Sequence, residues 1–418
     1  VRGYTTTEDG GESYDMLFTG ININRKAKSD ATWFGDYARA YAGSSLVLGL
    51  LPSEAHAAAR NFAENNISPT GLGLVSSGKP RFIPGTAAFK EAFNQVIADP
   101  NVLTGSKLVD NSRIYHSDAN YNFKDLISIA EIQVGGSFRQ YQLNSGGRIY
   151  TDADGPIRYD EYGVYTQVMK KFMDDRLKFT GSIRYDKSQN FKGNYSPRVS
   201  LVYSGGQNKN HNFRGSFQTG FRNPSTQDQY IGFNVGSAIL LGSAPDNLTR
   251  YSETLPIATA VGQAFAGGTS VTINGLNAYN NSYTASSIAA FSATGNTALL
   301  RKTNVDFVKP EEVKAFEVGY RSYINNTSID INGYYNEYNN FIGNLNVIAP
   351  LYGTAQDAPN AAGGPTDLGT RSLHALQNGN IRAFQLYTNT DLKIRSLGFG
   401  VGLSRKVYQD FEVGVNYN

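Results

Sequence analysis

The amino-acid sequence predicts an all-β protein, namely an antiparallel transmembrane β-barrel with long loops. Segments whose apolar and polar residues alternate recur along the 418 residues, so each such strand has one apolar and one polar face. Aromatic residues are abundant, with 27 Tyr and 23 Phe. The connections are very unequal, and short turns alternate with long inserts, as in barrels that cross outer membranes. These three observations together favour lipid on one side of the strands and water on the other.

The clearest strand covers residues 213–222, which read FRGSFQTGFR. Its odd positions are apolar, aromatic, Gly or Thr, and its even positions are Arg, Ser, Gln or Gly. Similar alternation predicts further strands, which start near residues 113, 127, 158, 177, 194, 316, 327 and 381 and, at the end of the chain, 411. The strand from 381 is expected to run to about 406. We count about ten to twelve strands, so we expect the chain to begin and end within a larger barrel.

The predicted connections separate into two classes. Short turns lie near residues 125, 174, 205–210, 325 and 408. Large inserts cover residues 5–112, 223–310 and 341–380, with a smaller one at 141–157. In outer-membrane barrels the long loops are extracellular, so we expect these inserts on that side. Within the first insert, residues 52–65 and 85–99 are predicted to be helices.

Composition excludes several classes of protein. The net charge is +3 and spread without runs, so no nucleic-acid-binding surface is predicted. No cysteine is present, which removes disulfides and thiolate chemistry. The mean hydropathy is −0.37, and no apolar run reaches the roughly 18 residues of a transmembrane helix. Neither mean hydropathy nor a search for apolar runs detects a membrane-spanning β-strand, because only every second residue of such a strand faces lipid.

Two stretches resemble ligand-binding motifs without completing them. Residues 73–80, GLVSSGKP, begin like a phosphate loop, but Pro80 stands where Ser or Thr must hold magnesium, and we predict a turn. Asp152-Ala153-Asp154-Gly155 begins like a calcium loop but is followed by Pro156 and has no acid at the twelfth position. We therefore expect a solvated turn there.

No catalytic or metal-binding set is indicated. The four histidines are far apart and form no HxxH or HExxH pair, although His56 could meet His116 in space. No GxSxG motif is present. We therefore predict no cofactor, no metal and no enzymatic activity.

The polar strand faces carry the remaining candidates. Seven charged residues are expected to face the lumen: Arg184, Arg198, Arg214, Glu317, Arg321, Asp330 and Lys393. They would either pair with one another or line a substrate path. Six residues are candidates for that path: Arg222, Tyr230, Phe233, Trp33, Phe34 and Tyr37. Long loops on a rigid scaffold are common recognition sites, but such aromatic residues can equally hold a loop together.

Four motifs resemble the barrel of TonB-dependent outer-membrane receptors of the type common in Bacteroidetes. They are RGYTTTED at 2–9, YSPR at 195–198, GFRNPS at 220–225, and KPEEVK at 309–314 followed by FEVGY at 316–320. The resemblance covers most of the chain and is weakest in the long loops. It implies a 22-stranded barrel closed by an N-terminal plug. This sequence contains no plug, TonB box or signal peptide, so the resemblance implies a partial barrel.

The resemblance also implies a function: active uptake of a scarce nutrient across the outer membrane of a Gram-negative bacterium. Partners would be outer-membrane lipid, the TonB–ExbB–ExbD complex acting through the plug, and a surface lipoprotein. A siderophore, a vitamin, an oligosaccharide and a peptide all remain open as the solute. A passive porin and an outer-membrane barrel enzyme are the alternatives, and the long inserts argue against the porin.

Overall fold

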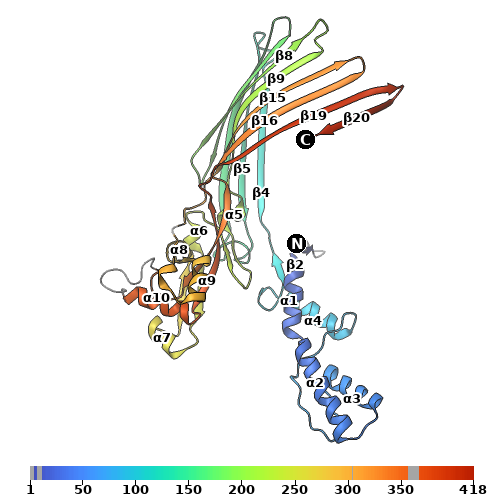
Figure 1. The fold of residues 1–418 in the computed structure, drawn as a ribbon. Helices are drawn as coiled ribbons and strands as arrows, with labels where there is room; N and C mark the ends of the chain where they lie inside the picture. Colours follow the sequence, from blue (N-terminus) through green and yellow to red (C-terminus); the bar gives the residue numbers. More distant parts are fainter. Residues whose placement is uncertain (1–3, 7–11, 304, 356–366) are drawn as a thin grey trace. The chain divides into compact units, whose positions relative to one another are not determined.

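The computed structural model describes residues 4–6, 12–303, 305–355 and 367–418. The chain separates into two compact units, Val1–Asn111 and Ser112–Asn418, and each is described by itself. Figure 1 shows the ribbon of both. The second unit holds most of the strands, whereas helices occur in the first unit and in the segments inserted into the second. The protein is thus mostly β, and the expectation of an all-β chain was too strict.

The N-terminal unit combines a small antiparallel sheet with helices. The sheet has the order β1-β2-β3, with β1 (Tyr4–Thr6), β2 (Glu12–Asp15) and β3 (Lys107–Val109). The helices are α1 (Met16–Lys26), α2 (Asp30–Ala42), the π-helical turn η1 (Gly43–Val47), α3 (Pro52–Asn65) and α4 (Ala87–Ala98). The two helices predicted from the sequence correspond to α3 and α4. The helices α1 and α2 were not predicted, although Asp15 and Ser29 cap their N-termini through side-chain oxygens.

A buried ion pair lies in the packing of this unit. The ammonium of Lys28 is 2.9 Å from the carboxylate of Asp36, and it also donates to the carbonyl of Ala63 and to the side chains of Asn66 and Ser76. Burial by itself raises the pKa of Asp36, but the hydrogen bonds from Ser76, Lys28 and Arg39 outweigh burial and lower this pKa. The incomplete phosphate-loop motif therefore contributes Ser76 to a structural network.

The second unit is built on a 10-stranded sheet with the order β20-β19-β16-β15-β9-β8-β7-β6-β5-β4. Its strands are β4 (Arg113–Asn122), β5 (Glu131–Leu143), β6 (Ile157–Phe172), β7 (Leu177–Ser188), β8 (Asn194–Gly205), β9 (His211–Arg222), β15 (Glu311–Ile324), β16 (Thr327–Asn339), β19 (Ile394–Tyr408) and β20 (Phe411–Tyr417). Every neighbouring pair is antiparallel. Within the described residues β4 and β20 do not pair with each other, so the sheet is open and closure remains a prediction.

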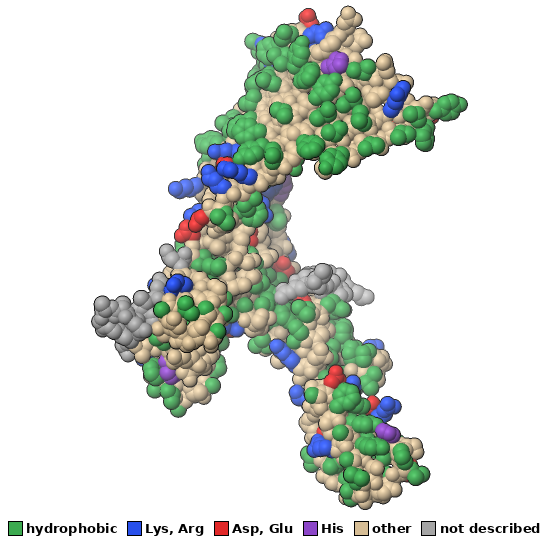
Figure 2. Space-filling model, in the orientation of Figure 1, with side chains coloured by type: hydrophobic (Ala, Val, Ile, Leu, Met, Phe, Trp, Pro, Cys, Tyr) green, Lys and Arg blue, Asp and Glu red, His purple; other side chains and the backbone are tan. Residues whose placement is uncertain are grey.

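The register gives this sheet two chemically different faces. One row of paired positions crosses six strands as Phe179, Leu201, Gly215, Val318, Gly333 and Phe399. The adjacent row, on the opposite face, reads Thr180, Ser200, Ser216, Glu317, Tyr334 and Gly398. We call these the apolar face and the polar face. Figure 2 shows hydrophobic side chains spread over this part of the molecule, and Val318 is 66% exposed.

The segments between β9 and β15 and between β16 and β19 fold together into one lobe. Its main sheet has the order β10-β11-β18-β17-β14, and β12 and β13 form a separate hairpin. The strands are β10 (Gly232–Asn234), β11 (Ile239–Leu241), β12 (Ser252–Pro256), β13 (Ser270–Asn274), β14 (Tyr283–Thr284), β17 (Ile342–Pro350) and β18 (Ile381–Asn389). The helices are α5 (Thr226–Tyr230), α6 (Asn247–Arg250), α7 (Ala260–Ala266), α8 (Gly275–Asn280), α9 (Ala285–Thr294), the 3₁₀ turn η2 (Thr297–Leu299) and α10 (Asp367–Gln377).

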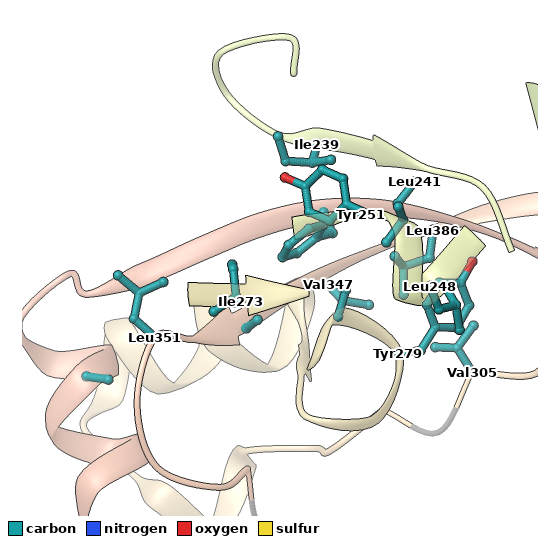
Figure 3. Close-up of a cluster of buried hydrophobic side chains, with 14 of the residues drawn as sticks. Ile239, Leu241, Leu248, Tyr251, Ile273, Tyr279, Val305, Val347, Leu351 and Leu386 are labelled. Atoms are coloured by element: carbon teal, nitrogen blue, oxygen red, sulfur yellow. The ribbon is translucent and has the colours of Figure 1, made fainter. Parts of the chain in front are cut away.

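The lobe has a hydrophobic core of its own. Figure 3 shows Ile239, Leu241, Leu248, Val347 and Leu386 converging from different strands and helices. β11 lies parallel to β18, so residues more than a hundred positions apart share one sheet. The two inserts were expected to be loops, and the described parts of both contain regular structure with buried side chains.

One predicted strand is two strands. Residues 381–406 were expected to form a single strand, but β18 ends at Asn389 in the lobe and β19 begins at Ile394 in the ten-stranded sheet. The backbone N–H of Leu392 donates to the side chain of Thr390 in the turn between them. Because Phe384 and Tyr387 of β18 are both buried, this strand is enclosed within the lobe instead of presenting one face to the surroundings.

Candidate functional site

A cavity of about 470 Å³ lies where the ten-stranded sheet meets the lobe. Its walls come from the lobe ends of β4, β5, β6, β7 and β9 and from the start of the segment after β9. The lining that matters here is polar or aromatic: Arg139, Tyr141, Tyr159, Glu161, Arg184, Asp186, Arg222 and Asn223. The volume falls within the range of small-molecule sites, so this cavity is the candidate site.

Arg222 joins three elements at the edge of the cavity. Its Nε and Nη2 donate to the two carboxylate oxygens of Glu311 at 2.7 and 2.8 Å, which ties β9 to β15. The same carboxylate accepts the backbone N–H of Ile342 at 2.7 Å, so it also holds the first residue of β17. Glu311 is nearly buried, whereas the Arg222 side chain is 63% exposed. Arg222 is therefore a structural link that still presents part of its guanidinium to the cavity.

A second guanidinium is fixed on β7. Nε of Arg184 donates to both carboxylate oxygens of Asp186, at 2.8 and 2.7 Å. Its Nη2 donates to the hydroxyl of Ser137 on β5, and its guanidinium lies 5.9 Å from the ring centroid of Tyr165. This set of contacts holds one orientation of the side chain, as a preformed binding site requires.

Tyrosine rings form the wall nearest the lobe. Tyr141 and Tyr159 stack at 4.6 Å between centroids, and Tyr159 contacts Tyr230 at 5.6 Å. The hydroxyl of Tyr230 accepts a hydrogen bond from Asn190, and burial raises the pKa of Tyr230. Tyr141 and Tyr159 present their stacked rings to the cavity, and Tyr230 supports them from the lobe side.

Glu161 is one of two acids that line the cavity, with Asp186, and both of its carboxylate oxygens accept hydrogen bonds. The side-chain amide of Asn223 donates to one oxygen at 2.7 Å, and the hydroxyl of Tyr141 donates to the other at 3.3 Å. Arg139 lies directly opposite Glu161 in the register of β5 and β6 and is exposed. The cavity thus offers guanidinium donors beside stacked rings, which suits binding of a polar or anionic solute.

Further from the lobe, the polar face carries an ion-pair network. Arg214 lies 3.4 Å from Glu317 and 3.3 Å from Asp330, and Arg321 lies 2.8 Å from Asp330. These four predicted lumen residues therefore lie together on one face, in the mutual pairing that was one of the two predicted roles. Arg184 and Arg198 share that face, and Arg198 is opposite Gln218.

Lys393 does not belong with the other predicted lumen charges. It precedes β19, and its ammonium lies 3.7 Å from Glu337. Glu337 is two residues beyond Tyr335 and pairs with Lys314 and Arg395, so it lies on the apolar face. The prediction for Lys393 relied on the single long strand 381–406, which the structure divides.

The structure separates the six substrate-path candidates. Of these, only Arg222 lines the cavity. Tyr230 and Phe233 are buried in the lobe, at 2% and 5% exposure, where they serve packing. Trp33, Phe34 and Tyr37 lie on α2 of the N-terminal unit, where Trp33 stacks on Tyr37 and Arg81 covers the Trp33 ring at 4.9 Å. Phe34 is the exposed member of this group.

Sequence reasoning missed most of the cavity. Glu311 is part of the KPEEVK motif, which could have identified it, but its partner Arg222 is 89 residues away. Tyr141, Tyr159 and Glu161 sit at the edges of the segment 141–157, which was read only as a connection. Cross-strand register brings these residues together, and no local pattern signals it.

The calcium-like segment is a structural turn. The carboxylate of Asp152 accepts hydrogen bonds from the hydroxyl of Ser145 and from the backbone N–H of Ser145 and Gly147. Asp152 is buried, so the expected solvated turn is wrong in that respect. Within the described residues, no group of three or more His, Cys, Asp or Glu could hold a metal ion. The helices of the described residues include none with the length and apolarity needed to cross a membrane.

Comparisons with known proteins bear on the fold. The family model described as "TonB dependent receptor-like, beta-barrel" matches residues 3–418. No curated protein matches the chain. Among solved structures, the siderophore receptor PirA of Pseudomonas aeruginosa is 13% identical, with 74% of this chain and 43% of that chain covered and a TM-score of 0.43.

Two other solved receptors are similar to a comparable extent. The ferric enterobactin receptor PfeA of Pseudomonas aeruginosa, as a mutant, is 14% identical, with 76% of this chain and 36% of that chain covered and a TM-score of 0.42. The hemophore receptor HasR of Serratia marcescens, also as a mutant, is 11% identical, with 72% and 40% covered and a TM-score of 0.36. The chain therefore spans less than half the length of these receptors.

Proposed function

Because the chain belongs to the TonB-dependent receptor β-barrel family, a family of outer-membrane β-barrels, we propose that it forms part of the wall and outer rim of a nutrient transporter. The apolar face would contact lipid and the polar face would line the lumen. The lobe and the other long segments would lie on the extracellular side. The complete protein would take up a scarce solute, driven by the TonB–ExbB–ExbD complex through a plug.

The two-faced sheet is the observation that carries this proposal. Val318 and Phe399 are exposed to more than half of their surface, whereas the neighbouring polar face holds the network of Arg214, Glu317, Asp330 and Arg321. Exposing the apolar face to water would cost free energy, whereas contact with lipid would not. The charges of the polar face require water on their side of the sheet. A soluble sheet that leaves this area uncovered would be prone to aggregation.

The cavity between sheet and lobe is the proposed entry site for the solute. Guanidinium groups held by Asp186 and Glu311, together with the exposed Arg139, would bind its polar or anionic groups, while Tyr141 and Tyr159 would pack against its flat parts. Siderophores, vitamins, oligosaccharides and peptides remain open. A Bacteroidetes-type receptor with a surface lipoprotein over the lobe is the finer version of this proposal.

The alternatives are weaker on the same observations. A passive porin would have less reason to build a packed lobe with a core of buried residues such as Leu241 and Leu386. A barrel enzyme would need a nucleophile beside a base, and the described lining of the cavity contains no histidine and no cysteine.

Single cysteines test the assignment of the two faces, since these 418 residues contain none. Val318→Cys and Ser216→Cys lie on adjacent rows and opposite faces. After labelling with a fluorophore and reconstitution of the whole protein with brominated lipids, we expect strong quenching at position 318 and weak quenching at 216. Equal quenching at both positions would refute the proposed membrane face.

A second experiment tests transport. We expect a strain with the complete gene to accumulate the correct solute only when TonB is present. Arg139→Gln should raise the half-saturation concentration of uptake roughly tenfold, because one charged hydrogen bond is lost. Arg198→Gln, on the same face but outside the cavity, is the matched control. Uptake that persists without TonB would favour the porin.

A further inference from the structure

Three basic side chains surround one acid at the lobe-side end of the apolar face. Lys314 on β15, Glu337 on β16 and Arg395 on β19 are successive cross-strand partners in one row. Lys314 is four residues before Val318 and Arg395 is four before Phe399, so the whole row lies on the apolar face. Figure 2 shows basic side chains, with acidic ones among them, gathered at the lobe end of the hydrophobic area.

The contacts within this row leave the cations accessible. Glu337 is largely covered, and it lies 3.7 Å from the ammonium of Lys393 and 3.6 Å from Nε of Arg395. Lys393 and Arg395 are 62% and 64% exposed, and Lys314 is exposed as well. The carboxylate of Glu337 therefore pairs with two cations, Lys393 and Arg395, and Lys314 lies opposite it in the strand register. Glu312, the next residue on this face of β15, adds a second acid beyond the row.

The position of the row matches a membrane boundary. On β19, Arg395 and Arg405 face the same side, and Leu397, Phe399, Val401 and Leu403 lie between them on that face. At about 3.4 Å per residue and the usual strand tilt, the two arginines lie roughly 25 Å apart along the membrane normal. That distance corresponds to the apolar band of an outer-membrane barrel. Phe316 and Tyr335 lie next to the row, at 6.4 Å between centroids, as expected for the aromatic border of such a band.

We propose that Lys314, Lys393 and Arg395 form a binding site for the phosphate groups of an outer-leaflet glycolipid of the diphosphorylated glucosamine-disaccharide type. The inference rests on the proposed function, which places the lobe on the extracellular side. Exposed ammonium and guanidinium groups at the edge of an apolar band complement phosphates carried on acyl chains. Glu337 holds Lys393 and Arg395 together in the absence of lipid, and strand register places Lys314 beside them.

The test uses the full-length protein in detergent with defined lipid added back. The triple variant Lys314→Gln, Lys393→Gln, Arg395→Gln is compared with Lys26→Gln, Arg60→Gln, Lys90→Gln, which removes the same charge from exposed residues of the N-terminal unit. Binding of diphosphorylated lipid A is measured by native mass spectrometry, with its fully dephosphorylated form as a second ligand. We expect the first variant alone to lose affinity for the phosphorylated lipid, on the order of tenfold to a hundredfold.

Three outcomes would overturn this inference. Equal affinity of wild type and the row variant for lipid A is one, and equal binding of both lipid forms by the wild type is another. Loss of phosphatidylglycerol binding in the row variant, with lipid A unaffected, would be the third and would place the lobe on the periplasmic side. TonB-dependent uptake by the wild type is measured separately, because its absence would sink the proposed function without touching the lipid result.

Discussion

The ten-stranded sheet and the lobe use the same kinds of side chain in opposite ways. In the sheet, Val318 is 66% and Leu397 80% exposed, whereas in the lobe Leu241 and Leu386 are fully buried. The lobe closes its apolar residues within its own core, and the sheet presents them to its surroundings. If the sheet is the barrel wall proposed above, the contrast reflects the solvent of each region, which is water around the lobe and lipid around the wall.

The largest difference between the two regions should come from replacing one phenylalanine in each of them by alanine. Phe384→Ala removes a ring that is buried in the lobe core, and we expect the lobe to lose about 3–5 kcal/mol of stability, because the ring leaves a cavity. Phe399→Ala removes a ring from the apolar face, where lipid can fill the space, so its effect should be several-fold smaller. Hydrogen exchange of lobe peptides in the reconstituted full-length protein measures the first loss. Comparable losses from both truncations would contradict the contrast.

A charge on each face should give the next largest effect. Val318→Lys places an ammonium in the middle of the apolar band and should destabilise the inserted protein by about 2–4 kcal/mol. Ser216→Lys lies on the opposite face, directly across from Glu317, and should be nearly neutral. Urea unfolding in liposomes, followed by heat-modifiable gel mobility, measures the difference. If both lysines were tolerated equally, neither face would be in lipid.

The junction between sheet and lobe should be less sensitive. Glu311→Gln removes the charge that pairs with Arg222 but leaves an oxygen for the N–H of Ile342. We expect a loss of about 1–2 kcal/mol, because the exposed Arg222 is screened by water. Limited proteolysis at the ends of β9 and β17 should detect looser attachment of the lobe. A double-mutant cycle with Arg222→Gln should show that the two changes are coupled, and additive effects would argue against the pair.

The smallest effect is expected from alkaline pH, which should lower the stability of the lobe by ionising buried tyrosines. Burial, and secondarily Glu253, raises the pKa of Tyr251, and burial likewise raises that of Tyr279. An unfolded tyrosine ionises near pH 10, so these groups stabilise the lobe fully below that pH, and the contribution falls as pH rises further. Near pH 11, Tyr251→Phe should reduce this alkaline loss by about 1 kcal/mol. The measurement is thermal unfolding at successive pH values, with phenolate absorbance as the signal. If the variant lost as much stability at alkaline pH as the wild type, Tyr251 would be excluded as the source.

Sequence reasoning succeeded where structure follows from neighbouring residues. The alternation in 213–222 and 316–321 predicted strands of the ten-stranded sheet and the contents of their two faces. The helix at 52–65 was recognised from its Pro-Ser-Glu start and its alanines. The helix α2 was missed, although Ser29 caps it and Trp33, Tyr37 and Tyr41 recur at helical spacing.

Failures occurred where distant segments meet. β11 is a three-residue strand, ILL, without a period of two, so no local pattern separates it from a loop. β18 was predicted as a strand, but its place in the lobe was not. The cavity joins residues of five strands and of the helix α5, and the link from Arg222 to Glu311 spans 89 positions. Lys393 was assigned to the wrong face because the division between β18 and β19 was not visible in the sequence.

By itself, the sequence determined that this protein has two-faced strands, since the alternation of residues is a local property of an extended chain. It also determined the family, because the TonB-dependent receptor β-barrel family model matches residues 3–418. Only the tertiary structure decided which inserts fold together, which charges pair and where a cavity opens. These features depend on strand register and on contacts across long sequence separations, and alternation within one strand carries no information about either.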